Sequence, residues 1–310
     1  MNRLISGTTA YAVFSGDITS KRISHAYMLH FQDAVNMRET LKIFALKFFG
    51  VPESDPIGKR IINETFPDLM IFPEAGKKFT VDSASALLAD CALKPLEGDK
   101  KLFVISGFND ASPLVQNKLL KTLEEPNEGV YFLLGVTSLA PVLDTVKSRV
   151  KKLTIPPFSE NEIFAALERR GGNPLNRQAA ESCGGIFGVA ESMVDGGWFA
   201  EVSRAANEIC TTNRVGRVGE VAVKYGDIKY KNELLNAIAL NYHKALRERV
   251  EGKALGEVAA CFETPALIYA AGSADRACRD LKFNAFFQGL LYDLMLRIIE
   301  ENDKWLKLRA

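Results

Sequence analysis

Two apolar runs with a helix-like segment between them form the clearest pattern in the chain. Residues 101–107 and 130–136 are mostly apolar, as buried strands of a parallel sheet are. Between them, Ser112 can cap a helix, Pro113 suits its first position and Pro126 ends it. The apolar face of this helix consists of Val115, Leu119, Leu120 and Leu123. Strand, helix and strand in this order predict a parallel sheet with helical crossovers.

The pattern changes along the chain from mixed strands and helices to helices alone. Further buried strands are expected at residues 26–29 and 69–72, and the double proline at 156–157 closes this first region. From about residue 196 onward, apolar residues recur only at helical spacing, and residues 281–308 form the longest such segment. We therefore expect an α/β domain that ends near the double proline, followed by helical structure.

The composition sets limits on this picture. The chain has 310 residues, 47 % hydrophobic and 25 % charged, which is ordinary for a protein that folds into two or three domains. Its net charge of +1 permits a local basic patch but not a protein-wide attraction to nucleic acid. Five scattered cysteines without a C-x-x-C pair indicate reduced thiols in a cytoplasmic protein and no zinc site. We expect neither a signal peptide nor a membrane-spanning segment.

Three short motifs resemble those of a known family. They are His25-Ala26-Tyr27, the segment 117–126 (Asn-Lys-Leu-Leu-Lys-Thr-Leu-Glu-Glu-Pro) and Ser148-Arg149. Together they are similar to motifs of the bacterial DNA polymerase III clamp-loader subunits, which are AAA+ ATPases. The resemblance extends to about residue 190. It implies three domains: an N-terminal AAA+ α/β domain with a P-loop-like parallel sheet at residues 1–157, a small helical lid domain at residues 158–205 and a C-terminal helical collar domain at residues 206–310.

The loop that would hold a nucleotide in this family lacks the residues for that task. Such a loop uses glycines so that its amides approach the phosphates, a lysine for charge, and Ser or Thr for magnesium. In the family register, the glycine positions hold Phe31, Ala34 and Asn36, the lysine position holds Met37, and the Ser/Thr position holds Arg38. No G-x-x-x-x-G-K-[ST] motif occurs in the chain. We therefore expect this chain to bind neither ATP nor another cofactor.

Two further features of the family are missing from the sequence. Where the strand of an ATPase ends in an acidic pair, residues 101–107 end in Ser106-Gly107. The segment 50–78, which corresponds to a four-cysteine zinc module in many clamp-loader subunits, has no cysteine. The resemblance therefore implies a subunit of a DNA polymerase holoenzyme that binds no metal and has no ATPase activity of its own.

Arg149 is the residue to which the resemblance gives a chemical role. In the family, the arginine of the Ser-Arg motif acts on ATP bound by a neighbouring subunit, so Arg149 is expected to act in catalysis in trans, together with Ser148. A guanidinium suits this task because it stays charged and offers forked donors to a phosphate. The simpler alternative is an exposed arginine that pairs with a nearby carboxylate. Lys118 and Lys121 are candidate DNA contacts, although a solvated helix face explains them equally well.

The resemblance implies a non-ATPase subunit that acts as the stator of a clamp-loader ring, which loads the sliding clamp onto DNA. Its expected partners are the motor subunits and the clamp-opening subunit of a hetero-pentamer, the sliding clamp, and primed DNA reached through the assembled ring. Two alternatives stay open: an ATP-binding motor subunit of the same ring, and an AAA+-like scaffold outside replication. The missing phosphate loop opposes the first alternative, whereas the second gives Arg149 no role.

Overall fold

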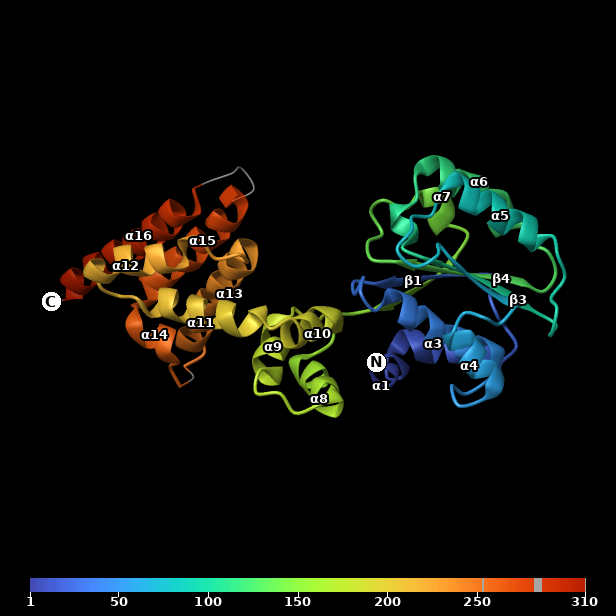
Figure 1. Cartoon of the computed structure of the whole chain (residues 1–310), viewed down its shortest axis with the longest axis horizontal. Helices are drawn as coiled ribbons and strands as arrows, with labels where there is room; N and C mark the ends of the chain where they lie inside the picture. The colour runs from blue at the N-terminus through green and yellow to red at the C-terminus, as the bar shows by residue number, and fades with distance from the viewer. Residues whose placement is uncertain (253, 282–285, 310) are drawn as a thin grey trace. The chain divides into compact units, whose positions relative to one another are not determined.

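The computed structural model describes residues 1–252, 254–281 and 286–309. A five-stranded sheet with the order β2-β3-β4-β1-β5 lies within the N-terminal part of the chain (Figure 1). Every neighbouring pair of strands in it is parallel, so the predicted parallel sheet is confirmed. The strands are β1 (Ala26–Phe31), β2 (Leu69–Phe72), β3 (Lys101–Ser106), β4 (Val130–Val136) and β5 (Lys151–Ile155). The edge strand β5 is not among the predicted strands.

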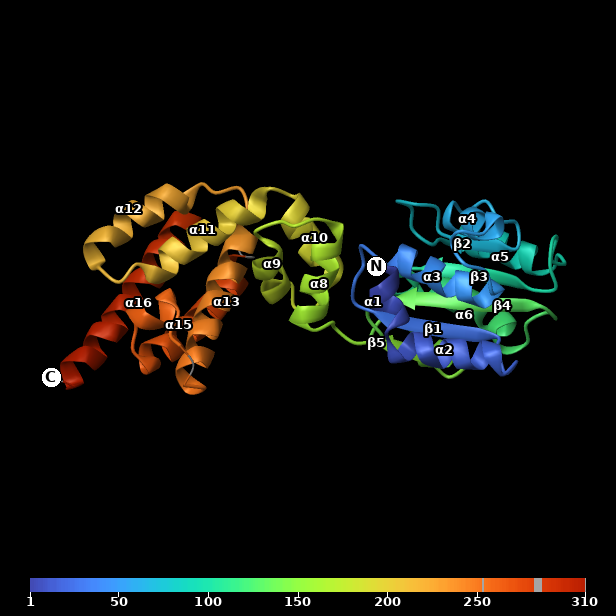
Figure 2. The ribbon, with the colours of Figure 1, turned by 90° about the horizontal axis from the view of Figure 1, so that it is seen from below.

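Helices cover both faces of this sheet (Figure 1). On one face lie α5 (Val81–Cys91), α6 (Pro113–Glu124) and α7 (Asp144–Lys147), and on the other lie α1 (Asn2–Ser6), α3 (Met37–Phe49) and α4 (Pro56–Ile62). Helix α2 (Thr9–Thr19) packs beside β5 (Figure 2), and the short helix η1 (Phe108–Asp110) follows β3. Because both faces are covered, the central strands are mostly apolar and buried, and the rings of Phe103 and Phe132 stack at a centroid distance of 5.6 Å.

Helix α6 forms as the sequence predicts. The Ser112 hydroxyl accepts a hydrogen bond from the amide of Val115 (3.4 Å), and Pro113 occupies the first helical position. The predicted apolar face is buried at Val115, Leu119 and Leu123, and half-buried at Leu120. This face of α6 packs in one buried cluster with apolar residues of β3 and β4.

Gln116 is a fully buried polar side chain on the same face of α6. Its Nε2 donates hydrogen bonds to the carbonyls of Ala111 (2.9 Å) and Pro141 (3.1 Å). Its Oε1 accepts one from the amide of Leu143 (2.9 Å), the residue that precedes α7. Because these bonds satisfy the backbone of the loop before α7, Gln116 ties that loop to α6.

The chain divides into two compact units, Met1–Glu191 and Ser192–Ala310. The first unit adds to the sheet the helices α8 (Glu160–Arg170), α9 (Asn176–Ser182) and the part of α10 (Phe187–Asp195) up to Glu191. A capping box opens α8: the Ser159 hydroxyl accepts the amide of Glu162 (3.3 Å), and the Glu162 carboxylate accepts the amide of Ser159 (2.9 Å). The expected three-domain division, with boundaries after residues 157 and 205, stays a prediction.

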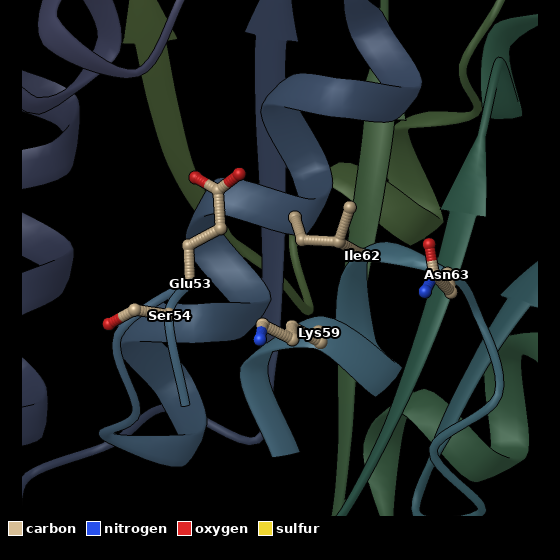
Figure 3. Close-up of a pocket in the computed structure, with 5 residues that line it drawn as sticks. All are labelled: Glu53, Ser54, Lys59, Ile62 and Asn63. Carbon is tan, nitrogen blue, oxygen red and sulfur yellow. The ribbon is translucent and has the colours of Figure 1, made fainter. Parts of the chain in front are cut away.

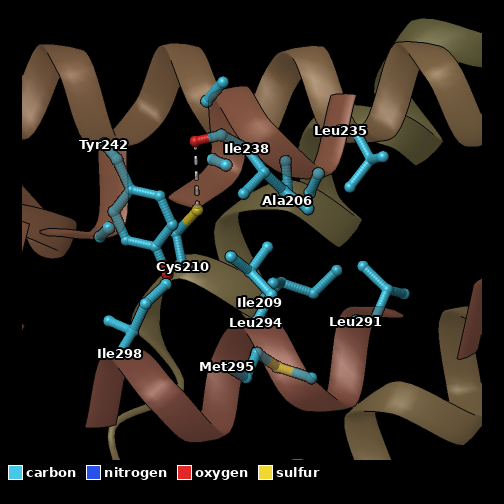
Figure 4. Close-up of a cluster of buried hydrophobic side chains, with 14 of the residues drawn as sticks. Ala206, Ile209, Cys210, Leu235, Ile238, Tyr242, Leu291, Leu294, Met295 and Ile298 are labelled. Carbon is cyan, nitrogen blue, oxygen red and sulfur yellow. Dashed lines mark hydrogen bonds between the residues drawn. The ribbon is translucent and has the colours of Figure 1, made fainter. Parts of the chain in front are cut away.

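The second unit is a helical bundle. Its described helices are α11 (Trp198–Thr211), α12 (Val215–Gly226), α13 (Lys231–Val250), α14 (Glu257–Cys261), α15 (Thr264–Asp280) and α16 (Phe287–Arg309). Figure 4 shows side chains of α11, α13 and α16 meeting in one apolar cluster, including Ile209, Ile238, Leu291, Leu294 and Met295. Inside it, the Cys210 thiol donates to the carbonyl of Ile238 (3.7 Å). The predicted helical segment 281–308 includes residues 282–285, which lie outside the described residues.

Candidate functional site

Side chains of the loop between β1 and α3, residues 32–36, form hydrogen bonds within the loop. Asp33 is almost fully buried (1 % exposed). Its Oδ1 accepts a hydrogen bond from the amide of Asn36 (3.1 Å), and its Oδ2 accepts from Asn36 Nδ2 (3.0 Å) and from the amide of Gly188 in α10 (2.7 Å). Asn36 Nδ2 also donates to Glu191 Oε2 (2.8 Å). A buried carboxylate therefore joins this loop to α10.

Two of the other residues at positions that correspond to the phosphate loop of the family, Phe31 and Met37, are packed in the core. Phe31 is buried, and its ring lies 6.1 Å from the ring of Phe158. Met37 is buried against β4, where a Cβ atom at Gly135 would lie 2.7 Å from the sulfur of Met37. Ala34 is exposed. None of these side chains carries a charge that could bind a phosphate.

Arg38, at the Ser/Thr position of the family motif, is bound by a carboxylate and a carbonyl. Its Nε donates to Glu64 Oε1 (2.7 Å), its Nη1 donates to the carbonyl of Pro73 (2.7 Å), and its Nη2 pairs with Glu64 Oε2. Lys42 Nζ lies 3.0 Å from the same carboxylate. The hydrogen bond from Arg38, helped by that from Lys42 and opposed by burial, holds the pKa of Glu64 below its usual value. Arg38 thus binds residues on both sides of β2, Glu64 before the strand and Pro73 after it.

Glu64→Gln should change how stability responds to acid. A carboxyl whose folded-state pKa is lowered adds stability above its unfolded pKa, near 4.5, and loses that stability as the pH falls through the folded-state value. We therefore expect the variant to be less stable than the parent at about pH 7, with a difference that shrinks below about pH 4.5. Urea unfolding over this range measures the effect, with Glu53→Gln at an exposed position as the control. A difference that does not vary with pH would contradict the assignment.

Hydrogen bonds between polar residues connect the ends of β3 and β4. The end of β3 is the place where an ATPase would carry its acidic pair. The side-chain carbonyl of Asn109 accepts hydrogen bonds from the amide (2.9 Å) and the hydroxyl (3.3 Å) of Thr137. Asn109 Nδ2 donates to the carboxylate of Asp110 (2.9 Å). Asn109 is therefore a bridge between two strand ends, which suits a structural role.

Arg149 lies between α7 and β5 and is held by groups of its own chain. Its Nε and Nη2 donate to Glu124 Oε2 (3.1 and 2.9 Å), at the C-terminal end of α6. Its Nη1 donates to the carbonyl of Thr145 (2.9 Å) and the hydroxyl of Ser148 (3.4 Å). The Arg149 side chain is 30 % exposed. The structure thus brings together Ser148, Arg149 and the recognised segment 117–126, which supplies Glu124. The trans role of Arg149 stays a prediction.

The two candidate DNA contacts lie on the exposed surface of α6. Lys118 Nζ donates to the hydroxyl of Ser85 in α5 (2.6 Å), and Lys121 is exposed in the last turn of α6. Both positions leave a basic group within reach of solvent. Contact with DNA stays a prediction.

A surface depression of about 590 Å³ lies beside α4 (Figure 3). It is lined by Glu53, Ser54, Lys59, Ile62 and Asn63, and none of these belongs to the loop at residues 32–36.

Within the described residues, no three His, Cys, Asp or Glu side chains lie together as a metal ion would require. In the same part of the chain, we find no helix long and apolar enough to cross a membrane.

A protein-family model described as "DNA polymerase III, delta subunit" matches residues 7–159, which span the sheet and the helices α2 to α7. The N-terminal half of this chain is therefore similar to that family. The delta′ subunit of DNA polymerase III from Bacillus subtilis is 30 % identical over 163 residues, 51 % of this chain and 50 % of the relative. The tau/gamma subunit from Haemophilus influenzae is 29 % identical over 157 residues, 48 % of this chain and 23 % of the relative.

The delta-subunit family match has a limited extent. The chain spans about half the length of the curated delta′ relatives that it matches. A solved DNA polymerase III gamma-subunit-related protein from Thermotoga maritima has a TM-score of 0.45 and 13 % identity, and the match covers 95 % of this chain and 100 % of that one. Relatives named delta′ and relatives named gamma or tau/gamma therefore both match this chain.

The sequence assigns no partner to Asp33, Glu124 or Gly188. The Asp33–Asn36 spacing is typical of a local cap at a helix start, so half of the Asp33 arrangement has a sequence signal. Its bond to Gly188 joins residues 155 positions apart, and the Glu124–Arg149 pair spans 25 positions. Neither long-range pair has a signal in a single sequence.

Proposed function

We propose that this chain is a delta′-like, non-ATPase subunit of a DNA polymerase III clamp loader, the stator of a ring that loads the sliding clamp onto primed DNA. The family match of residues 7–159 supports a place in such a loader. The observation that carries the non-ATPase part is the buried Asp33 carboxylate inside the former phosphate loop. Because like charges repel in a buried site, a phosphate there would meet the Asp33 anion, and the lysine position of the family motif holds the neutral Met37.

The alternative of an ATP-binding motor subunit fits the loop poorly. Motor function needs a lysine charge and a hydroxyl for magnesium. Here the corresponding side chains are Met37, which is buried against β4, and Arg38, which is paired with Glu64. The gamma and tau/gamma relatives therefore resemble this chain in fold, and the site favours the non-ATPase function.

In this proposal, Arg149 acts on ATP held by the adjacent motor subunit, and Ser148 helps to hold it. Glu124 and the carbonyl of Thr145 fix the long side chain at a half-exposed position between α7 and β5. A guanidinium held in one rotamer loses less conformational entropy when it meets a phosphate. Nε and Nη2 of Arg149, which here donate to Glu124 Oε2, can then donate instead to phosphate oxygens of the ATP bound by the neighbouring subunit.

The remaining parts of the proposal concern assembly. Residues 158–205 would form the lid and residues 206–310 the collar through which the chain joins the motor subunits and the clamp-opening subunit. Lys118 and Lys121, exposed on α6, would contact the phosphates of primed DNA in the assembled ring.

The isolated chain should not bind ATP. Because a buried methionine replaces the lysine, a paired arginine replaces the Ser/Thr and the buried Asp33 carboxylate lies inside the loop, we expect a Kd weaker than about 1 mM for Mg-ATP. Isothermal titration of the full chain measures this, with a motor subunit of the same loader as the positive control. Saturable binding at micromolar ATP would contradict the non-ATPase assignment and favour the motor alternative.

A further inference from the structure

The Asp33 carboxylate lies where two helices begin. On one side, Asn36 is the N-cap residue of α3, and its amide donates to Asp33 Oδ1 (3.1 Å). On the other side, Gly188 is the second residue of α10, and its amide donates to Asp33 Oδ2 (2.7 Å). The aligned peptide dipoles leave a partial positive charge at each helix start, and a shared anion there is stabilised by both.

A bound phosphate is the usual anion at such a position. Free amides at a helix start bind phosphate oxygens, and a nucleotide can thereby join the segments that contact it. In this chain the anion is covalently part of the loop and is almost fully shielded from water (1 % exposed). We propose that Asp33 is a built-in substitute for a phosphate, which holds α10 against the β1–α3 loop permanently and without a nucleotide.

The contact leaves no room for a larger residue on α10. A Cβ atom at residue 188 would lie 2.4 Å from Asp33 Oδ1, 2.8 Å from the Cβ of Val35 and 2.9 Å from Asn36 Nδ2. Real Cβ atoms do not approach other atoms so closely, so the backbone distance between α10 and the loop depends on a glycine. Gly188 therefore permits the short hydrogen bond to Asp33.

A second connection runs beside the first. Asn36 Nδ2 donates to Glu191 Oε2 (2.8 Å), one turn further along α10. The other carboxylate oxygen of Glu191 accepts from Arg170 Nη1 (2.8 Å), the last residue of α8. The loop thus contacts α10 directly and α8 through Glu191. Within the first unit, these polar contacts couple residues 160–191 to the sheet domain, and a hydrogen bond to a buried charge is stronger than a neutral one.

The consequence is a fixed position of α10 against the β1–α3 loop. A phosphate that joins two helix starts holds them only while it is bound, whereas a covalently attached carboxylate is present in every state. The β1–α3 loop and α10 should therefore stay together whether or not ATP is present. This inference goes beyond the proposed function, because it concerns contacts inside one chain and makes no use of Arg149.

Residue-resolved amide hydrogen exchange of the full chain tests the inference, because the Gly188 amide is itself one of the bonds. In Asp33→Asn, which keeps the side-chain shape and removes the charge, we expect this amide to exchange about 10- to 100-fold faster. In Gly188→Ala, we expect the amide of residue 188 to lose protection to a similar extent, because the Cβ atom separates α10 from the loop. Amides of β1 and β4 should keep their parent rates in both variants.

Two matched controls accompany these variants. Asp82→Asn removes an exposed aspartate from the first turn of α5, and Gly172→Ala adds a Cβ atom where no atom lies within 4 Å. Both should leave Gly188 protection unchanged, as should Mg-ATP added to the parent chain. The inference is overturned if the Gly188 amide exchanges at the parent rate in Asp33→Asn, if the loss of protection spreads equally over the sheet, or if ATP raises Gly188 protection. Failure of the trans-arginine proposal would leave all these outcomes unchanged.

Discussion

Arg149→Ala should slow ATP hydrolysis at the motor site that this chain faces by about 10³-fold or more, the typical contribution of an arginine supplied in trans. The expectation rests on the proposed function and on the position of the guanidinium between α7 and β5, where Glu124 and Thr145 hold it half-exposed. Alanine removes the charge that would stabilise the transferring phosphoryl group. It leaves the core untouched, because this ion pair lies at the surface and adds little to stability.

Single-turnover hydrolysis by a loader assembled from the full chain and its own motor and clamp-opening subunits measures this effect. Arg149→Lys should recover only part of the rate, because an ammonium keeps the charge and loses the planar fork. Arg22→Ala, at an exposed arginine near the start of β1, is the matched control and should hydrolyse ATP at the parent rate.

Asp68→Ala should lower the free energy of unfolding by about 3–5 kcal/mol, although the residue lies outside every candidate site. Its carboxylate is fully buried and accepts three backbone hydrogen bonds, from the amides of Leu96 (2.6 Å), Glu97 (2.9 Å) and Gly98 (3.0 Å). Alanine leaves these three donors without their acceptor inside the protein. Each hydrogen bond to a charged group contributes about 1.5–3 kcal/mol, and the losses do not add in full.

Urea unfolding measures the loss in Asp68→Ala. Asp99→Ala, at an exposed aspartate in the same segment, is the control and should change the free energy of unfolding by less than about 0.5 kcal/mol. A loss below about 1 kcal/mol in Asp68→Ala would show that the segment at residues 96–98 finds other acceptors and that Asp68 does not organise it.

The sequence predicts α6 well because each of its signals is local. The cap at Ser112, the proline at position 113 and the apolar spacing all act within one or two helical turns. The strands β3 and β4 are equally clear, since burial on both faces makes them apolar throughout. By contrast, β5 begins with two exposed lysines at the edge of the sheet, so its composition does not differ from that of a polar loop.

The candidate site is only partly predictable for a related reason. The sequence shows which residues are missing from the phosphate loop, because a motif is a local pattern. It does not show what replaces the function of those residues, because Asp33 meets Gly188 and Arg149 meets Glu124 only after the chain has folded. A charged residue in a loop is usually exposed, and nothing at Asp33 itself indicates that it is buried.

We propose that this chain holds no nucleotide and supplies Arg149 to the nucleotide of a neighbour. The rate of ATP hydrolysis by the assembled loader, measured after assembly has been verified, tests this role of Arg149. We expect the parent chain and Arg149→Ala to enter the loader in equal amounts, and only the parent chain to support fast hydrolysis. Hydrolysis at the parent rate in a fully assembled loader that contains Arg149→Ala would contradict the claim.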